Sequence, residues 1–505
     1  MVDFILISAK INFGKTQKAK GGIKMTLAKK KSITGSMDMT EGAILSKIIR
    51  FVMPIMVTNI LQMLYNAADI MVVSLSAEQN AVGAITTASP FVALIVNIFI
   101  GFAVGSNVLV ARFLGAKDHE RVSRTVHTSV IVSLIVGVLC AIVGVFISRP
   151  VLSMMGASGN LLELSTLYTI IYFCGTPFMA ATNFLSSIFR AKGDTKTPLY
   201  VLSVSGIINV VLNFIFVKAF NMSVEGVSIA TAVANAVSAV VLLWILSKDE
   251  GPCRFSFKKC RLDKSAVLGI IKEGLPAGIN GAVFSLSNML ITSSILTVNN
   301  LMTPAGSAYE PIVKGNGAAM NIGGFVYTAV NSVYQAAITF TSQNVGAKKY
   351  KRVWRVMIST ISFAMLVGAI SSLLVFVFKD PLLSLYGVAE GAEGTLEKMA
   401  YDAAITRVIF VISTYCIIAW QEAGCGVVRG LGRSTLSMIV SLIGACGFRV
   451  AWIGFVFPMS QTLETIYISY PLSWALTGIV QILCGVICLK ALIKKQEREE
   501  LIVNS

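Results

Sequence analysis

The chain has 505 residues, of which 55% are hydrophobic and 13% charged, with a mean hydropathy of +0.77 and a formal net charge of +17. Repeated apolar stretches of about twenty residues exclude a soluble globular protein and indicate a polytopic helical membrane protein, because helices satisfy their own backbone groups in lipid. The positive charge does not indicate nucleic-acid binding, because Lys and Arg gather in short loops and in the N-terminal tail, where they orient membrane helices.

Residues 1–40 form a basic tail with eight Lys and no apolar periodicity. The apolar piece at residues 4–7 is too short for the core of a signal peptide, and no basic residue precedes it. We expect this tail to be disordered and cytoplasmic, with contact to anionic membrane lipid.

Twelve membrane-spanning helices are predicted after the tail. Basic loops follow the even-numbered helices, whereas the loops after helices 1, 7 and 11 contain Glu78, Glu310 and Glu464 and almost no Lys or Arg. The positive-inside rule therefore predicts a multi-pass protein of the cell membrane with both termini in the cytoplasm. The predicted helices lie near residues 47–76, 82–112, 124–148, 161–183, 197–219, 225–247, 268–298, 312–342, 353–378, 401–422, 434–457 and 467–492.

The two halves of the chain repeat one another. The tripeptide Gly-Ala-Lys at 115–117 recurs 231 positions later at 346–348, and further matches follow at the same shift. Six helices plus six in the same orientation predict two parallel repeats with a substrate path between two lobes, which is a transporter architecture. The predicted lobes are residues 41–247 and 268–492, joined by a cytoplasmic linker at 248–267 and followed by a cytoplasmic tail at 493–505. Other matched pairs are Pro54 with Pro276 and Asn66 with Asn288 at a shift of 222, Pro150 with Pro381 and Gly156 with Gly387 at 231, and Arg190 with Arg429 and Gly193 with Gly432 at 239.

The first predicted helix carries one ionisable residue in its interior, Asp69. A carboxylate in a membrane helix costs roughly 2.5–3.5 kcal/mol on insertion scales and usually faces a protein interior or a water-filled cavity. Asn66 lies about one turn earlier on nearly the same face. We interpret Asp69 as a protonatable or cation-binding group in a transport pathway. The alternative is a residue that caps an interfacial helix end.

Several stretches, most of them near helix ends, carry a family resemblance. They are LYNAADIMVVS, FLGAKDHERVSR with its second copy SQNVGAKKYKRVWR, IFRAKGDTKTPL, INVVLNFIF, GVSIATAVA and VVRGLGRSTLSMIVSLIGACGFR. In their order and doubling they resemble the multidrug and toxic compound extrusion family of secondary antiporters, over residues 41–490. The resemblance implies an all-α, V-shaped, two-lobed bundle of twelve transmembrane helices. It also implies export of amphipathic, often cationic molecules in exchange for protons or sodium.

The resemblance further implies a cation site in the first lobe, formed by Asp69, by Asn209 and Asn213 on helix 5, and by Thr231 on helix 6. The i, i+4 spacing places the two Asn on one helix face, where their amide oxygens can ligate a cation or bind a protonated carboxyl. Asn213 stands where many family members carry Asp. Because the loss of a carboxylate weakens a sodium site, protons are favoured over sodium as the coupling ion. The structural alternative for the Asn pair is interhelical hydrogen bonding.

The second lobe lacks a copy of this acid, because the shift of 222 takes Asp69 to Ile291. It offers Glu273, Glu422 and Arg449 as a possible polar site. We interpret Glu273 as a first-turn acid that favours the helix dipole, whereas a buried Arg449 needs a partner. A substrate cavity is predicted from aromatic, amide and Met side chains, although such residues more often face lipid or the core. These cavity candidates are Tyr65, Asn66, Met289 and Tyr334.

Other function classes fit the sequence less well. Only two His are present, and the nine Cys form no metal-binding spacing, so no metal, cofactor, disulfide framework or enzymatic site is predicted. A channel lacks rings of like charge or a filter motif. The remaining alternative is a flippase for a lipid-linked oligosaccharide, which would need a basic rather than an acidic cavity. We expect a monomer whose partners are membrane lipid and a small amphipathic substrate.

Overall fold

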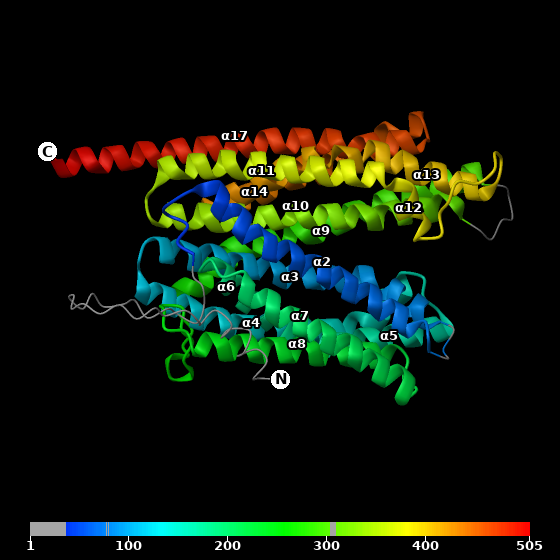
Figure 1. Cartoon of the computed structure of the whole chain (residues 1–505), viewed down its shortest axis with the longest axis horizontal. Coiled ribbons are helices and arrows are strands. Elements are labelled where there is room, and N and C mark those ends of the chain that lie inside the picture. The colour runs from blue at the N-terminus through cyan, green and yellow to red at the C-terminus, as the bar shows by residue number, and fades with distance from the viewer. Residues whose placement is uncertain (1–36, 77, 79, 304–309, 505) are drawn as a thin grey trace, which may run out of the picture. The chain divides into compact units, whose positions relative to one another are not determined.

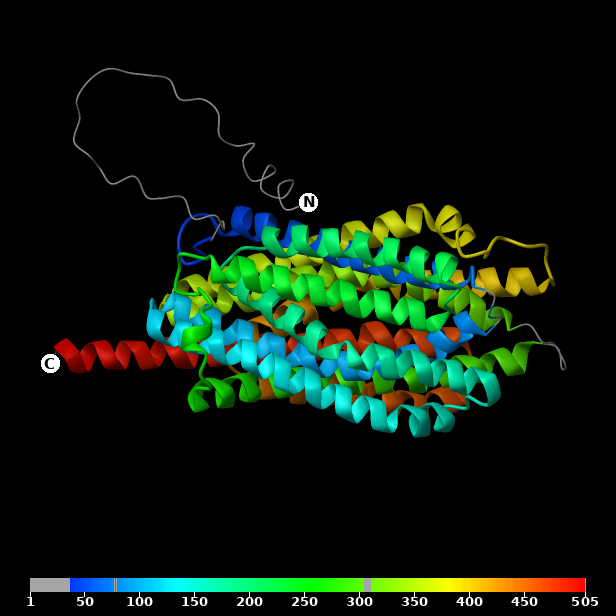
Figure 2. The ribbon, with the colours of Figure 1, turned by 90° about the horizontal axis from the view of Figure 1, so that it is seen from below.

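The computed structural model describes residues 37–76, 78, 80–303 and 310–504. Within this part of the chain every regular element is a helix, and the long helices lie side by side (Figures 1 and 2). The first half comprises α2 (Ile44–Val73), α3 (Ala81–Gly115), α4 (His119–Met154), α5 (Gly159–Cys174), α6 (Thr176–Ala191), α7 (Lys196–Phe214), the π-helical turn η1 (Ile215–Ala219) and α8 (Val224–Ser247).

The second half begins after the short 3-10 turn η2 (Phe257–Lys259). Its helices are α9 (Lys264–Met302), α10 (Pro311–Gly346), α11 (Tyr350–Val377), α12 (Lys379–Ser384), α13 (Leu396–Phe410), η3 (Ile412–Thr414), α14 (Tyr415–Gly430), α15 (Ser434–Ser441), the π-helical turn η4 (Leu442–Gly447), α16 (Phe448–Phe455), η5 (Phe457–Met459) and α17 (Leu463–Asn504). The last helix thus continues beyond residue 492, where the sequence predicts the final span to end.

Ten helical segments of the described chain are long and apolar enough to cross a membrane, and an eleventh forms if α5 and α6, bent by 49°, count as one span. The remaining predicted span is α10, which has 36 residues and packs against α3, α11, α13 and α14. Because other helices cover much of α10, its polar residues need not face lipid. The predicted all-α membrane fold is therefore confirmed.

The repeat seen in the sequence is also a repeat of backbone conformation. Left-handed residues, which have positive φ and are uncommon outside glycine, occur at matching positions of the two halves. The turn after α3 and the turn after α10 each place a Lys in this conformation, so the same turn is built twice. The matched pairs are Lys117 and Lys348 (φ 57° and 54°), Gly156 and Gly387 (93° and 66°), and Gly193 and Gly432 (86° and 78°).

Glycines on α3 and α9 bring the backbones of the two halves close together. A Cβ atom built on Gly105 would lie 2.5 Å from the carbonyl oxygen of Ile270, and one built on Gly274 would lie 2.7 Å from the Cα of Phe102. Small residues at such crossings let helix backbones pack directly against each other in membranes. The assignment of residues 41–247 and 268–492 to two lobes stays a prediction.

The chain before α2 is packed between the halves. Residues 1–36 of the predicted tail lie outside the described residues, but Met39 is fully buried and its N–H donates to Oε1 of Gln343 over 3.2 Å. Gln343 also donates to the carbonyl oxygen of Ala191 over 2.7 Å. One side chain of α10, in the second half, therefore binds both the first half and the segment that leads into α2.

The connection between the halves folds onto the first half. Cys253 and Phe255 are buried against α4, α6 and α8. The ring of His127 stacks on Phe255, and its Nε2 accepts a hydrogen bond from the N–H of Ser256 over 3.0 Å. This segment is thus an integral part of the first half, which leaves the turn before α9 as the link to the second.

Candidate functional site

Asp69 lies near the C-terminal end of α2, half-buried against α7. Its Oδ1 accepts a hydrogen bond from Nδ2 of Asn213 over 2.5 Å. One turn earlier, the hydroxyl of Tyr65 donates to the carbonyl oxygen of Ser203 over 3.1 Å, and its ring occupies the space that Gly206 leaves open. The missing side chain at Gly206 thus lets α2 approach α7 closely enough for the carboxylate to reach Asn213.

The other two predicted members of this site complete one cluster. Nδ2 of Asn209 donates to Oγ1 of Thr231 over 3.2 Å, and Nδ2 of Asn213 lies 3.5 Å from Oδ1 of Asn209. Thr231 also interacts with Asp69. The structure therefore brings all four predicted residues together from α2, α7 and α8. We call Asp69, Asn209, Asn213 and Thr231 the Asp69 cluster.

One acceptor of the Asp69 cluster is unsatisfied. Asn213 is fully buried, yet its Oδ1 has no hydrogen-bond partner in the described part of the chain. A buried polar atom without a partner costs about 1–3 kcal/mol, so a water, an ion or a proton donor is expected to satisfy it. The oxygen can accept a proton carried by a carboxyl group or ligate a cation. The π-helical turn η1 begins two residues later, and such turns are frequent at functional sites.

The structure contradicts the interpretation of Glu273 as a first-turn acid. Helix α9 begins at Lys264, capped by Asp263, which accepts a hydrogen bond from the N–H of Ala266 over 2.9 Å. Glu273 is therefore nine residues into the helix, and it is buried. Its Oε2 accepts hydrogen bonds from the N–H (3.2 Å) and the hydroxyl (2.6 Å) of Ser434. The apolar run of the sequence begins later than the helix, so the sequence predicts a helix start that is too late.

The three polar candidates of the second half have separate partners. Glu273 binds Ser434, as described above, and interacts with Arg112 of the first half. Glu422, half-buried on α14, interacts with Arg429. Arg449 contacts aromatic rings of α17 instead of an acid. These residues therefore do not form one site.

The predicted cavity residues occupy different environments. Asn66 and Met289 are exposed, Met289 to 51%. Tyr65 is half-buried and bonded to α7, as described above. Tyr334 is buried, and its hydroxyl accepts a hydrogen bond from Nη1 of Arg429. Tyr65 and Tyr334 thus bond to neighbouring helices, whereas Asn66 and Met289 are exposed, and the substrate cavity stays a prediction.

Sequence reasoning missed a second buried arginine, Arg407 on α13. It is 5% exposed and donates from Nη1 to Oδ1 of Asn316 over 2.7 Å. The signal was available, because Arg407 lies inside the predicted span 401–422, just as Arg449 lies inside 434–457. Among the described residues, no group of three or more His, Cys, Asp or Glu side chains could hold a metal ion.

The family model MatE matches residues 54–215 and 282–453 of the chain. The chain belongs to the multidrug and toxic compound extrusion (MATE) family. The two matched stretches lie in the two halves, in agreement with the internal repeat. The family resemblance noted in the sequence is thereby confirmed, and with it membership of a family of multidrug efflux transporters.

Bacterial relatives of the MATE family match most of the chain. Two Bacillus subtilis (strain 168) proteins, the probable multidrug resistance proteins YoeA and YpnP, are each 25% identical, over 85% and 83% of this chain and 90% and 91% of their own length. The multidrug export protein MepA of Staphylococcus haemolyticus (strain JCSC1435) is 24% identical over 52% of this chain and 58% of its own length.

Solved MATE-type structures share the fold. The outward-facing conformation of a multidrug resistance MATE family transporter of the MOP superfamily matches with a TM-score of 0.80, over 90% of this chain and 98% of that one, at 20% identity. A MOP superfamily transporter from Pyrococcus furiosus matches with a TM-score of 0.81 at the same identity and coverage. At this identity the likeness concerns the fold alone.

Proposed function

We propose that this protein is a secondary active exporter of the cell membrane, with both termini in the cytoplasm. It exchanges amphipathic, cationic small molecules for protons by alternating access between its two halves. The names of its relatives, multidrug resistance and multidrug export proteins, support the substrate class. The observation that carries the proposal is the Asp69 cluster, a single carboxylate held by neutral donors inside an apolar bundle.

The chemistry of exchange follows from the surroundings of Asp69. None of the ion pairs within 4.0 Å in the described chain includes this carboxylate. A partly buried carboxylate without a cation is unfavourable in a low-dielectric bundle. It is therefore stabilised either by a cationic substrate nearby or by a proton. These two states exclude each other, which couples proton entry to substrate release.

Asn213 can form a hydrogen bond with Asp69 in both protonation states of the carboxyl group. When Asp69 is ionised, the amide N–H of Asn213 donates to it, as in the structure. When Asp69 is protonated, its hydroxyl donates to an amide oxygen, and the attraction for a cationic substrate disappears. The substrate then leaves outward. A site with one carboxylate and three neutral side chains suits a proton better than sodium, because a hard cation favours several oxygen ligands and the loss of a carboxylate weakens such a site.

Transport in proteoliposomes tests this proposal. A proton gradient and a sodium gradient are imposed separately, and export of a fluorescent lipophilic cation such as ethidium is followed. We expect the proton gradient alone to drive export. We expect Asp69→Asn to fold normally but to lose gradient-driven export by about tenfold or more, which corresponds to roughly 1.4 kcal/mol of lost coupling.

Glu163→Gln is the matched control, because Glu163 is an exposed acid on α5 of the same half. Proton release on addition of the lipophilic cation to purified protein provides the second measurement. Wild type and Glu163→Gln are expected to release protons, and Asp69→Asn is not. If the sodium gradient drives export and the proton gradient does not, protons are not the coupling ion. If Asp69→Asn exports the cation and releases protons as wild type does, Asp69 does not couple proton entry to substrate release.

A further inference from the structure

The second half buries two arginines that have no acidic partner. Arg407 on α13 is 5% exposed and Arg449 on α16 is 3% exposed. In the part of the chain that the structure describes, neither guanidinium has a carboxylate oxygen within 4.0 Å. Each buried ion of this kind carries a desolvation penalty of several kcal/mol, which a nearby negative charge normally offsets.

Aromatic rings surround both guanidiniums but do not neutralise them. The Cζ of Arg449 lies 4.2 Å from the ring centroid of Tyr470 and 5.5 Å from that of Trp474. The Cζ of Arg407 lies 5.5 Å from the same Tyr470 ring and 5.4 Å from that of Tyr467. Cation–π contacts of this kind offset only part of the desolvation penalty of the two buried charges. The rings hold two like charges around Tyr470 without cancelling either.

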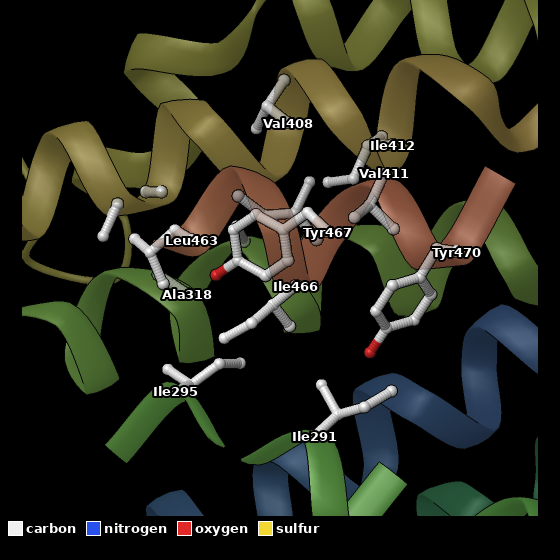
Figure 3. Close-up of a cluster of buried hydrophobic side chains, with 14 of the residues drawn as sticks. Ile291, Ile295, Ala318, Val408, Val411, Ile412, Leu463, Ile466, Tyr467 and Tyr470 are labelled. Carbon is white, nitrogen blue, oxygen red and sulfur yellow. The ribbon is translucent and has the colours of Figure 1, made fainter. Parts of the chain in front are cut away.

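Hydrogen bonds leave a donor of Arg449 unused. Its Nε donates to Oγ of Ser473 over 3.0 Å, whereas its buried Nη2 has no acceptor among the described residues. Oδ1 of Asn316, which accepts from Arg407, also accepts from the hydroxyl of Tyr467 over 2.9 Å. The close-up in Figure 3 shows the hydroxyl of Tyr470 directed toward Ile291 of α9, whereas the hydroxyl of Tyr467 lies toward α10. The cluster thus holds two positive charges and one buried donor, Nη2 of Arg449, that has no acceptor in the described part of the chain.

The internal repeat places this cluster where the first half has the Asp69 cluster. Helices α8 and α17 begin at Val224 and Leu463, which gives the shift of 239 that also relates Gly193 to Gly432. At this shift Thr231 of α8 and Tyr470 of α17 occupy equivalent positions of the repeat.

The same comparison relates α7 to α15 and α16. A shift of 239 pairs Asn209 with the residue before Arg449. The π-helical turn η4 adds one residue to the second half before this point, so Asn209 aligns with Arg449 itself. The Asn209–Thr231 contact of the first half therefore corresponds to the Arg449–Tyr470 contact of the second. The counterpart of Asp69 is Ile291, so the acid is missing and positive charge has been added.

We propose that Arg407 and Arg449 form an anion site in the second half that takes a single carboxylate group. The planar guanidinium matches a carboxylate in geometry and charge. The carboxylate belongs either to a free small anion or to an amphipathic substrate. The site goes beyond cation exchange at Asp69 and does not rest on it, because the two clusters lie in different halves and share no residue.

Binding is tested by thermal unfolding of the purified full-length protein in detergent. The melting temperature is followed while sodium acetate or sodium benzoate is titrated. A ligand that binds only the native state raises the melting temperature in a saturable manner. We expect a saturable rise in wild type, with acetate if the site takes a free small anion, and with benzoate alone if it requires an attached apolar group. The absence of a saturable rise with either salt overturns the proposal.

Variants separate the site from general salt effects. Arg449→Gln is expected to lose the saturable rise, whereas Arg121→Gln, at an exposed arginine of α4, keeps it. Ile291→Asp provides an independent variant, since it places a carboxylate where the repeat locates the counterpart of Asp69. We expect Ile291→Asp to fold and to lose the rise, because the chain then supplies its own anion. A rise of wild-type size in both Arg449→Gln and Ile291→Asp would refute the assignment.

Discussion

Gly115 at the end of α3 and Gly346 at the end of α10 lie at a symmetric crossing, each against the backbone of the other helix. A Cβ on Gly115 would overlap the carbonyl oxygen of Gln343, and one on Gly346 would overlap that of Arg112. Both glycines, and both carbonyl residues, are related by the repeat shift of 231. The crossing therefore joins the two halves at matching points, at the end of the bundle assigned to the cytoplasm.

The first prediction concerns this crossing. In Gly115→Ala, the added methyl group meets backbone rather than a movable side chain, so the closed contact should weaken by about 1–3 kcal/mol. Alternating access requires the crossing to open, and the variant should therefore populate an opened state. Spin labels attached to Glu120→Cys and Lys351→Cys, at exposed positions related by the repeat, should show a new, longer distance in double electron–electron resonance.

Gly317→Ala is the control, because a Cβ at this helical glycine meets no atom within 4 Å. Both substitutions replace a helical glycine by alanine, but only Gly115→Ala adds a methyl group at the crossing. An unchanged distance distribution in Gly115→Ala would show that this contact does not close the lobes.

The second prediction concerns the choice of ion. Asn213→Asp places a second carboxylate beside Asp69, in place of the amide that now donates to it over 2.5 Å. Two carboxylates this close repel each other, and a bound cation relieves the repulsion. We expect sodium to raise the melting temperature of the variant in a saturable manner and to become able to drive export. Asn321→Asp, at an exposed position of α10, should show neither effect. A variant that stays indifferent to sodium would contradict this view of the site.

The third prediction concerns a buried ion pair outside the spans. Nζ of Lys192 lies 3.1 Å from Oδ2 of Asp249, and both side chains are 5% exposed. Removal of one partner of a buried pair typically costs about 3–5 kcal/mol. We therefore expect Asp249→Asn to lower the free energy of unfolding by that amount. The pair Lys192→Met/Asp249→Leu should recover much of it.

Glu499→Gln is the matched control, because the Lys495–Glu499 pair on α17 is exposed and such pairs contribute about 0–1 kcal/mol. Unfolding in mixed detergents measures both variants against wild type. Equal stability of Asp249→Asn and Glu499→Gln would mean that the buried pair does not stabilise the connection between the halves.

The fourth prediction concerns topology. Lys258 on η2 and Glu464 at the start of α17 are both exposed, and the charge pattern assigns them to the cytoplasm and to the outside. In a background without native cysteines, a membrane-impermeant thiol reagent added to intact cells should label Glu464→Cys and spare Lys258→Cys. The reverse pattern would place both termini outside. Lysed cells, in which both positions react, control for reactivity.

The sequence alone determined the class of the protein, its repeat and its central acid. Membrane spans can be predicted from the sequence because each helix must itself be long and apolar enough to cross the bilayer. The repeat can be detected in the sequence because turns of the same backbone conformation require similar residues, as the left-handed Lys117 and Lys348 show. Asp69 is readable because one acid in an apolar helix is costly wherever it points.

Tertiary structure alone decided which residues meet. The i, i+4 spacing puts Asn209 and Asn213 on one face, but only the packing of α2 and α8 on α7 brings Asp69 to Asn213 and Thr231 to Asn209. The sequence predicts that a buried Arg449 needs a partner, but only the structure shows that aromatic rings from α17 surround it. Such partners come from helices far apart in the chain. Their choice depends on how the helices pack together, which no local pattern of residues encodes.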